Sequence, residues 1–538
     1  MPLREHIPDT PITRYQPDVS ESDISISSLA YWNTWWKTGK ITSDPDLTNW
    51  FNSTFKWKPR LIEALEPRDV IYVLRGPRRI GKTTLLKLRI KELLEGTGEK
   101  EKEGEGEEGG GTPVPPSNIF YYPCDSLYGN SQNLPLIIDT YLDKQRKLGH
   151  RAYLFIDEVS MLDGWQNVVK PLIDANRFKD CTVVFTSSHS INLQKSTESL
   201  AGRRGMVQDL EYGTPDKILL PAKFSEYVET LDVTLRKEIN DLELFRKKVR
   251  EDTFLALAAG TITPRLERLA LFTREINHLL DQYLLTGGIA QAVDRYLSKG
   301  TITQDTYDTF VDHLMRDLVR YGRKETLTRQ IVKRIIDIMP SHTSWNRLKE
   351  GTEVKDHKTA CKYVESLSET FAVTYLYQLG LDRAWPEYDK EKKIYVRDPF
   401  IFHAFRSWIY GRDAFDLSLD FLSSPINKSG LVECVVGDHL SRLMFIFHPS
   451  SRFKPSDYVF YWRNKKDQEV DFTIQIEDKF LPLEVKYKDT IKRDDTRGVC
   501  SFVKDSKSHS FGIITSKNLL KAEEKYSLVP LGLLLLLI

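Results

Sequence analysis

The chain has 538 residues, of which 40% are hydrophobic and 28% charged, and its formal net charge is +1. This composition is typical of a globular protein with several domains. The balanced charge excludes a protein that is basic over its whole surface, so a surface that binds nucleic acid has to be local. Five cysteines stand singly without a CxxC pair, which excludes a cysteine zinc site and favours reduced thiols in a cytoplasm.

The two ends of the sequence give no sign of a membrane segment. The opening MPLREHIPDT lacks the apolar core of a signal peptide. The apolar ending VPLGLLLLLI is shorter than the roughly 20 residues that span a bilayer. We therefore expect a cytoplasmic protein with no membrane partner, whose last residues form a buried strand or helix.

Residues 1–56 are rich in tryptophan. Trp32, Trp35 and Trp36 stand at positions i, i+3 and i+4, which share one face of a helix. This spacing favours a helical segment that packs on the next domain over a platform on which a ligand stacks.

Residues 57–222 have the pattern of an α/β domain. The segment DVIYVLRGPRRIGKTTLLKLRIKELL reads as a buried strand, a loop and a helix, and further strands follow in NIFYYPCD, RAYLFIDEV and CTVVFTSSHS. Strands that alternate with helices predict a largely parallel sheet. A run of Gly, Glu and Pro over residues 95–117 cannot build a core and is predicted to be a disordered insert.

The loop GPRRIGKT fits the pattern G-x-x-x-x-G-K-[ST] between a strand and a helix, as a phosphate-binding loop requires. Backbone N–H groups wrap the phosphates at the start of the helix. Lys82 is expected to reach the β- and γ-phosphates of ATP, and the Thr83 hydroxyl to bind Mg²⁺. The predicted nucleotide contacts are Gly76, Pro77, Arg78, Arg79, Ile80, Gly81, Lys82, Thr83 and Thr84.

The strand YLFIDE supplies the acidic half of the same site. Its apolar residues bury the strand and deliver Asp157 to Mg²⁺, while Glu158 is expected to polarise the attacking water. The order of the two motifs predicts hydrolysis of ATP as well as binding.

Three further residues are candidates for the ATP reaction. The strand CTVVFTSSHS ends in the polar residues Thr186, Ser187 and Ser188, where a side chain can sense the γ-phosphate; Ser187 is the candidate, and a plain turn is the alternative. Arg203 and Arg204, in SLAGRRG, are either arginine fingers that reach the nucleotide of a neighbouring subunit or surface charges.

Helices dominate the middle of the chain. Residues 223–300 are predicted to be helical, and residues 301–384 have the outline of a winged helix, with two short amphipathic helices before a strand. The second helix, DHKTACKYVESL, would present a basic surface to duplex DNA; as a module that packs on protein it would have no such role. The basic residues are Lys355, His357, Lys358 and Lys362.

The segments GPRRIGKTTLLK, LFIDEV, TSSHSINLQKSTESLAGR and KFSEYVE, in this order, resemble an archaeal-type AAA+ ATPase, a group also found in bacteria. The resemblance runs from about residue 57 to the end. It implies an α/β fold with a P-loop AAA+ core, a helical lid, a winged helix and, over residues 385–538, a domain similar to PD-(D/E)xK nucleases. Where the lid motif of this group has Gly-Gly-x-Pro, this chain has GGIA, with Ala290 in place of proline.

The nuclease-like pattern lies in EVDFTIQIEDKFLPLEVKYKD. Two short strands can pair as a hairpin, and period-2 alternation puts Glu484 and Lys486 on one face. Asp471 and Glu484 are expected to hold Mg²⁺, and Lys486 to position or deprotonate water. In this nuclease class a preceding helix often adds an acid, here Glu433. Such domains also degenerate into binding modules, so an active metal site is one of two outcomes.

Two functions fit these predictions. The first is a ring-like homo-oligomer that hydrolyses ATP to remodel or process DNA, with metal-dependent cutting as an added activity. The second is a nucleotide-driven switch whose C-terminal domain recruits a protein partner without catalysis.

Overall fold

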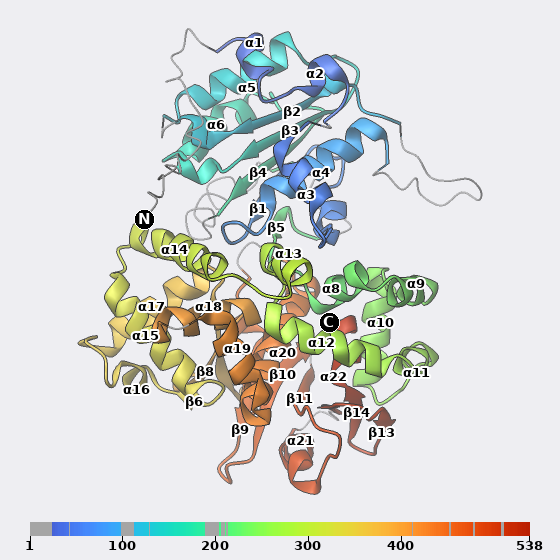
Figure 1. The fold of residues 1–538 in the computed structure, drawn as a ribbon, viewed down its shortest axis with the longest axis vertical. Coiled ribbons are helices and arrows are strands. Elements are labelled where there is room, and N and C mark those ends of the chain that lie inside the picture. Colours follow the sequence, from blue (N-terminus) through green and yellow to red (C-terminus); the bar gives the residue numbers. More distant parts are fainter. Residues whose placement is uncertain are drawn as a thin grey trace, which may run out of the picture.

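The computed structural model describes residues 24–41, 43–97, 112–127, 130–188, 204–205, 210, 213–411, 413–450, 453–476, 479–506 and 511–538. Residues 98–111 of the predicted insert lie outside these ranges. Figure 1 shows an upper part with a twisted sheet and a lower part in which helices surround a second sheet.

The upper sheet has five parallel strands in the order β2-β3-β4-β1-β5, so β4 lies between β1 and β3. Alternate residues of each strand pack on opposite faces. In β1, Tyr72 and Leu74 contact one core cluster and Ile71 and Val73 another. The strands are β1 (Ile71–Arg75), β2 (Ile119–Pro123), β3 (Ala152–Asp157), β4 (Cys181–Ser187) and β5 (Asp216–Ile218).

Helices cover both faces of this sheet, as the alternation of strands and helices predicts (Figure 1). One face carries α3 (Pro45–Asn52) and α4 (Lys82–Glu95). The other carries α1 (Ile26–Leu29), α5 (Asn133–Lys144) and α6 (Trp165–Asp174). The order of strands and the two covering layers are those of a P-loop AAA+ core.

Trp35 and Trp36 lie in the short helix α2 (Trp35–Thr38) and Trp32 in the turn between α1 and α2, where the spacing predicts one helix for all three. The indole N–H groups of Trp35 and Trp36 both donate to the carbonyl oxygen of Ile119, at 3.0 and 2.9 Å. Trp36 also stacks on Tyr141. These contacts explain the tryptophans through packing and leave them no ligand-stacking role.

The segment predicted to be a helical lid contains α8 to α13 and receives the apolar end of the chain. Its helices are α8 (Phe224–Leu231), α9 (Val233–Asp241), α10 (Lys247–Ala258), α11 (Pro264–Ala270), α12 (Thr273–Thr286) and α13 (Ala290–Lys299). The final helix α22 (Leu531–Leu537) packs against α8, α10 and α12 and is buried throughout. Among the described residues, none of the helices is both long and apolar enough to cross a membrane.

The segment predicted to be a winged helix has the element order helix, helix, strand, helix, helix and hairpin. The elements are α14 (Gln304–Arg320), α15 (Glu325–Ile338), β6 (His342–Thr343), α16 (Trp345–Lys349), α17 (His357–Glu369), β7 (Val373–Gly380) and β8 (Trp385–Val396). Because β7 and β8 pair antiparallel, the expected boundary after residue 384 falls inside a hairpin.

The lower sheet has nine strands in the order β13-β14-β12-β11-β10-β9-β7-β8-β6. β7 pairs with β9, so the hairpin β7–β8 and the C-terminal strands form one continuous sheet. The remaining strands are β9 (Val459–Arg463), β10 (Glu469–Ile476), β11 (Lys479–Glu484), β12 (Gly512–Ser516), β13 (Lys521–Ala522) and β14 (Tyr526–Pro530). The helices are α18 (Pro399–Tyr410), α19 (Ala414–Ser423), α20 (Pro425–Phe447) and α21 (Arg493–Asp505).

The segment GGIA joins the lid to this lower body. The N–H of Gly288 donates to Asp398 Oδ2 at 2.9 Å, and its carbonyl accepts from the N–H of Ala222 at 2.9 Å. A Cβ on Gly287 would lie 2.1 Å from Asp398 Oδ1. The two glycines are therefore required by close packing, and Ala290 begins α13.

Candidate functional site

The phosphate-binding loop connects β1 to α4 at the carboxyl end of the upper sheet. Arg79 and Gly81 have φ angles of 56° and 99°, the left-handed conformation that turns successive N–H groups toward one point. A Cβ on Gly76 would lie 2.2 Å from the carbonyl oxygen of Leu219, so only glycine lets the loop start this close to the neighbouring chain. Ile80 is buried beneath the loop and holds it in place.

Lys82 is the first residue of α4 and is almost completely buried. Its Nζ donates to the carbonyl oxygens of Gly76 and Pro77, at 3.0 and 2.9 Å, and lies 3.6 Å from Glu158 Oε1. The ammonium group therefore sits inside the loop, within reach of an anion that the loop would hold.

Thr83 and Asp157 meet as the two motifs predict. The Thr83 hydroxyl donates to Asp157 Oδ2 at 2.7 Å, and the Tyr121 hydroxyl donates to the same oxygen at 3.0 Å. Burial and the nearby Asp157 raise the pKa of Tyr121 well above its ordinary value, so this phenol stays a donor. A hydroxyl and a carboxylate side by side at the start of α4 fit a magnesium ion, which prefers hard oxygen ligands.

The end of β4 contacts the two acids of β3. The Thr186 hydroxyl donates to Asp157 Oδ1 and accepts from the N–H of Glu158 at 2.8 Å. The Ser188 hydroxyl donates to Glu158 Oε2 at 3.1 Å. Thr186 and Ser188 are two residues apart and share a face of the strand, which Ser187 does not. The predicted sensor Ser187 is buried in the same strand.

The arginines around the nucleotide site differ in position. Arg78 of the loop donates from Nε to Asp317 Oδ1 of α14 at 2.7 Å, so the loop is linked to the lower body. Arg204 is buried; it donates to Asp216 Oδ2 at 2.7 Å and to the carbonyl oxygen of Ile71. These internal contacts do not fit an arginine finger, and we do not propose Arg204 for that role. Arg203 lies outside the described residues.

Comparison with known proteins gives matches to three domain families. Residues 68–228 match the family described as AAA domain. Residues 277–410 and 429–534 match two domains of unknown function, DUF8612 and DUF4143. Residues 68–228 form an AAA+ P-loop domain. No curated protein matches the chain.

Two solved structures show only a distant similarity to this chain. The Orc1 protein of Aeropyrum pernix in complex with DNA is 12% identical, with a TM-score of 0.27, over 69% of this chain and 96% of that chain. A RuvB variant of Thermotoga maritima is 16% identical, with a TM-score of 0.21, over 67% of this chain and 92% of that chain. These scores describe likenesses too weak to identify the arrangement of the whole chain.

The predicted nuclease-like residues gather in the lower sheet. β10 and β11 form the expected antiparallel hairpin, and α20 brings Glu433 to the same place. The N–H of Asp471 donates to Glu484 Oε2 at 3.3 Å, and Lys486 Nζ donates to Glu484 Oε1 at 2.6 Å. The sequence pattern therefore places its four residues together, although they come from three elements.

A second lysine, which sequence reasoning missed, lies among these acids. Lys393 of β8 is 3% exposed, and its Nζ lies 3.1 Å from Glu433 Oε1 and 3.3 Å from Asp471 Oδ1. It is also 2.6 Å from Glu469 Oε1. Only the pairing of β7 with β9 brings this wing strand to the acids, so no local signal in the sequence identifies Lys393.

The protonation of these acids follows from burial and the two lysines. Burial and the charge of Asp471 raise the pKa of Glu433 to about 7 and that of Glu484 to about 8. Although burial opposes it, Lys393 and Lys486 hold the pKa of Asp471 below its ordinary value. The Tyr395 hydroxyl donates to Glu433 Oε1 at 2.6 Å. The cluster is thus neutralised by protons and lysines.

This arrangement does not fit a magnesium ion. Lys393 Nζ takes the position between Glu433 and Asp471 that a cation would need. Within the described ranges, no three His, Cys, Asp or Glu side chains gather in a way that would hold a metal ion. A metal could enter only if Lys393 moved away.

Proposed function

We propose that this protein hydrolyses ATP at the loop between β1 and α4. The observation that carries the proposal is the meeting of Thr83 with Asp157 at 2.7 Å beside Lys82. Lys82 would neutralise the β- and γ-phosphates, and Thr83 and Asp157 would hold Mg²⁺. The magnesium ion would supply charge stabilisation for the transferred phosphoryl group.

Glu158 has the position of the residue that orients and polarises water. It follows Asp157 directly, its side chain is partly exposed, and Ser188 holds its Oε2 at 3.1 Å. Thr186 would act as the γ-phosphate sensor in place of Ser187, because it bonds both Asp157 and the backbone of Glu158. Because its hydroxyl contacts both residues, Thr186 would couple a movement of Asp157 to a movement of Glu158.

We further propose that ATP turnover drives a surface that binds DNA. The Arg78–Asp317 pair links the phosphate loop to α14, which leads into the winged-helix segment. At the start of α17 a group of basic side chains is exposed, and the wing carries Trp385 and Tyr388, exposed by 61% and 51%. Exposed cations suit a phosphate backbone, and exposed aromatic rings suit unstacked bases. The basic residues are Lys355, His357, Lys358 and Lys362.

For the C-terminal domain we propose binding without cutting, because Lys393 neutralises the acids that a nuclease would use for metal. Metal-dependent cutting is the second candidate, since Glu433, Asp471, Glu484 and Lys486 are together. Assembly into a ring-like homo-oligomer, or recruitment of a protein partner, would follow the nucleotide state.

The experiment measures ATP turnover and DNA cleavage in the same tubes, with labelled single-stranded, duplex and junction DNA and with Mg²⁺ or Mn²⁺. We expect turnover that rises with DNA and falls with salt, and no cleavage by the wild type. A variant with Lys358→Glu and Lys362→Glu should turn over ATP without responding to DNA. Turnover that no form of DNA stimulates would contradict the DNA proposal and favour the nucleotide switch. Cleavage that Asp471→Ala abolishes would contradict the non-cutting role.

A further inference from the structure

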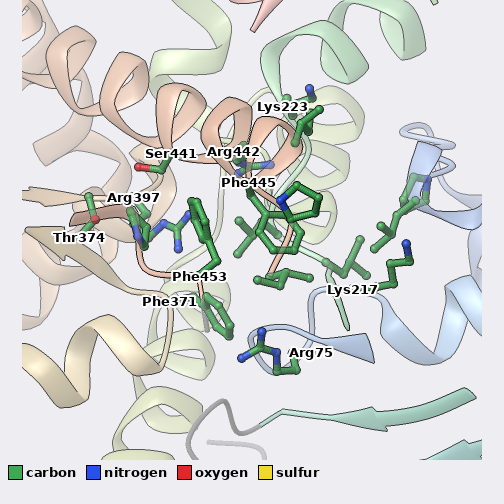
Figure 2. A pocket seen from close by; sticks show the side chains of 18 of the residues that line it. Arg75, Lys217, Lys223, Phe371, Thr374, Arg397, Ser441, Arg442, Phe445 and Phe453 are labelled. Carbon is green, nitrogen blue, oxygen red and sulfur yellow. The ribbon is translucent and has the colours of Figure 1, made fainter. Parts of the chain in front are cut away.

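A large cavity lies at the junction of the AAA+ domain, the lid and the lower sheet. Its volume is about 540 Å³, which is in the range of pockets that take small molecules. Its walls come from the end of β1, from β5, from α8 and α10, from α17 and β7, from Arg397 directly after β8, and from α20. Figure 2 shows side chains from these distant segments turned toward the same space.

The lining is strongly basic although the chain as a whole is nearly neutral. Nine of the lining residues are Arg or Lys and four are Glu. Aromatic side chains stand between the cations: Figure 2 shows Phe371, Phe445 and Phe453 among Arg75, Arg397 and Lys217. A concave surface with this mixture presents charge and apolar area to the same occupant.

Two of the cations are buried without a full set of partners. Arg75 is 6% exposed, and its Nε has no hydrogen-bond partner in the part of the chain that the structure describes. Arg250 is 8% exposed, and the same holds for its Nη1. Burial lowers the pKa of Arg75, and it lowers that of Arg250 to about 10 with help from the charge of Arg60. Such desolvated cations cost stability unless an anion pairs with them.

Other basic residues of the wall are explained by the fold. Arg397 and Arg442 donate from Nε to the two carboxylate oxygens of Asp438, at 2.7 and 2.6 Å. They shape the cavity and need no ligand. Arg75 and Arg250 differ because neither guanidinium forms an ion pair with an Asp or Glu among the described residues, although Asp216 acts on Arg75 and Glu229 on Arg250 from a longer distance. Both arginines line the cavity with an incomplete set of hydrogen bonds.

We propose that this cavity binds a phosphorylated small molecule with an aromatic or apolar body, at a site separate from the ATP site. Guanidinium groups match the geometry and charge of phosphate oxygens. The phenylalanines of the opposite wall would cover the body of the ligand. Nothing in this site depends on ATP hydrolysis or DNA binding, so the inference stands apart from the proposed function.

The test uses the full chain saturated with a non-hydrolysable ATP analogue and Mg²⁺, because Arg75 directly precedes the phosphate loop. Anilinonaphthalene sulfonate, which joins an aromatic body to an anion, is titrated by fluorescence and then displaced with inorganic pyrophosphate. We expect one saturable site per chain. Arg250→Met should weaken binding by about tenfold or more, as the loss of a charged hydrogen bond implies. Lys248→Met, on an exposed position of the same helix, should have no effect.

The stability of the same variants separates a ligand site from a structural role. Removing a buried cation that lacks a partner should leave the Tm of the free protein unchanged or raise it, while the stabilisation by the probe is lost. Lys223→Met, at another point of the wall, provides a second variant if Arg250→Met does not fold. Unsaturable fluorescence, or equal binding by both wall variants and wild type, would overturn the proposal.

Competing ligands identify the source of the phosphate chemistry. A nucleoside diphosphate that displaces the probe more strongly than farnesyl diphosphate supports a nucleotide-like ligand, and the reverse supports a lipid-like one. Displacement by duplex DNA together with failure of all the small phosphates would overturn the assignment to a small molecule.

Discussion

The two acidic sites of this protein both place a lysine beside carboxylates, yet the lysines stand in different surroundings. Lys82 bonds two backbone carbonyls of a loop whose N–H groups favour anions. Lys393 lies within ion-pair distance of three carboxylates in a buried sheet. The first arrangement is completed by an incoming phosphate, whereas the second is already neutral. Two sites with similar motif residues can therefore differ in whether they leave room and charge for a ligand.

The difference has a structural origin. The ATP site lies at the carboxyl end of parallel strands, where a loop and a helix start leave backbone groups for a ligand. The C-terminal acids lie between β8, β10, β11 and α20, where Lys393 is already paired with them, although Glu469 and Lys486 at the edge of the cluster are partly exposed. Variants of the two lysines test this comparison most directly.

Lys82→Ala should cause the largest loss. Without the ammonium group the charge on the transferred phosphoryl is not stabilised, so ATP turnover should fall by about 10³-fold. Steady-state phosphate release measures it, with Lys91→Ala, an exposed position on the same helix, as control. Equal rates for both variants would mean that hydrolysis occurs elsewhere.

Lys393→Met should lower stability, in contrast to the effect on turnover at Lys82. The variant leaves buried carboxylates without their cation, which should cost about 3 kcal/mol of the free energy of unfolding. Urea denaturation at pH 8 measures the loss. Lys392→Met, on the opposite face of β8, where the ammonium donates to the carbonyls of Tyr388 and Lys390, is the matched control.

The same variant shows whether Lys393 replaces a metal. Calorimetry should detect Mn²⁺ binding to Lys393→Met and none to the wild type. Tight binding of Mn²⁺ by the wild type would show that the lysine does not exclude a cation, and the two acidic sites would then be alike.

Glu158→Gln should separate binding from chemistry at the ATP site. The amide cannot polarise water, so turnover should fall by about 10²-fold while ATP still binds. Equilibrium binding of a fluorescent ATP analogue, measured beside turnover, distinguishes the two effects. A variant that loses affinity and rate together would indicate that Glu158 is needed for the shape of the loop.

Acidification should act on the lower body through buried histidines. His439 is neutral, since its Nδ1 donates to the Val435 carbonyl at 2.8 Å and its Nε2 accepts from the Phe224 N–H at 3.0 Å. Burial and Arg442 lower its pKa from 6.5 to about 3. Between these values the folded state binds fewer protons than the unfolded state, so stability falls as pH falls below about 6.5.

At pH 5 the loss from this residue should be about 2 kcal/mol relative to pH 7. Thermal unfolding from pH 7.5 to pH 5 measures it, and His439→Gln should reduce the pH dependence, to which His403 also contributes because burial lowers its pKa to about 4. His357→Gln, at an exposed position, should leave the pH dependence unchanged. If His439→Gln kept the full pH dependence, other groups would have to cause it.

Much of the nucleotide site could be predicted because its signals are local. The residues 76–83 and 152–158 each contain a complete strand-to-loop pattern, and the structure joins them as Thr83 and Asp157 require. Which polar residue at the end of β4 senses the γ-phosphate stays a prediction, because the polar run does not reveal which of its residues face the acids; the structure gives the contacts of Thr186 and Ser188 to Asp157 and Glu158. Val184, Thr186 and Ser188 alternate along the strand and so point to one side of the sheet. The sequence does not say whether that side carries Asp157 and Glu158.

The sequence by itself determined the elements whose chemistry lies within one segment: the phosphate loop, the acidic strand, the β10–β11 hairpin and the burial of the apolar final helix. These follow from periodicity, glycine conformation and local hydrogen bonding. Only the tertiary structure decided what depends on distant partners: the shared nine-stranded sheet, Lys393 among the acids, and the basic cavity formed by Arg75 and Arg250. Strand order and charge pairing between segments are set by packing across the whole molecule, and no single stretch of residues encodes them.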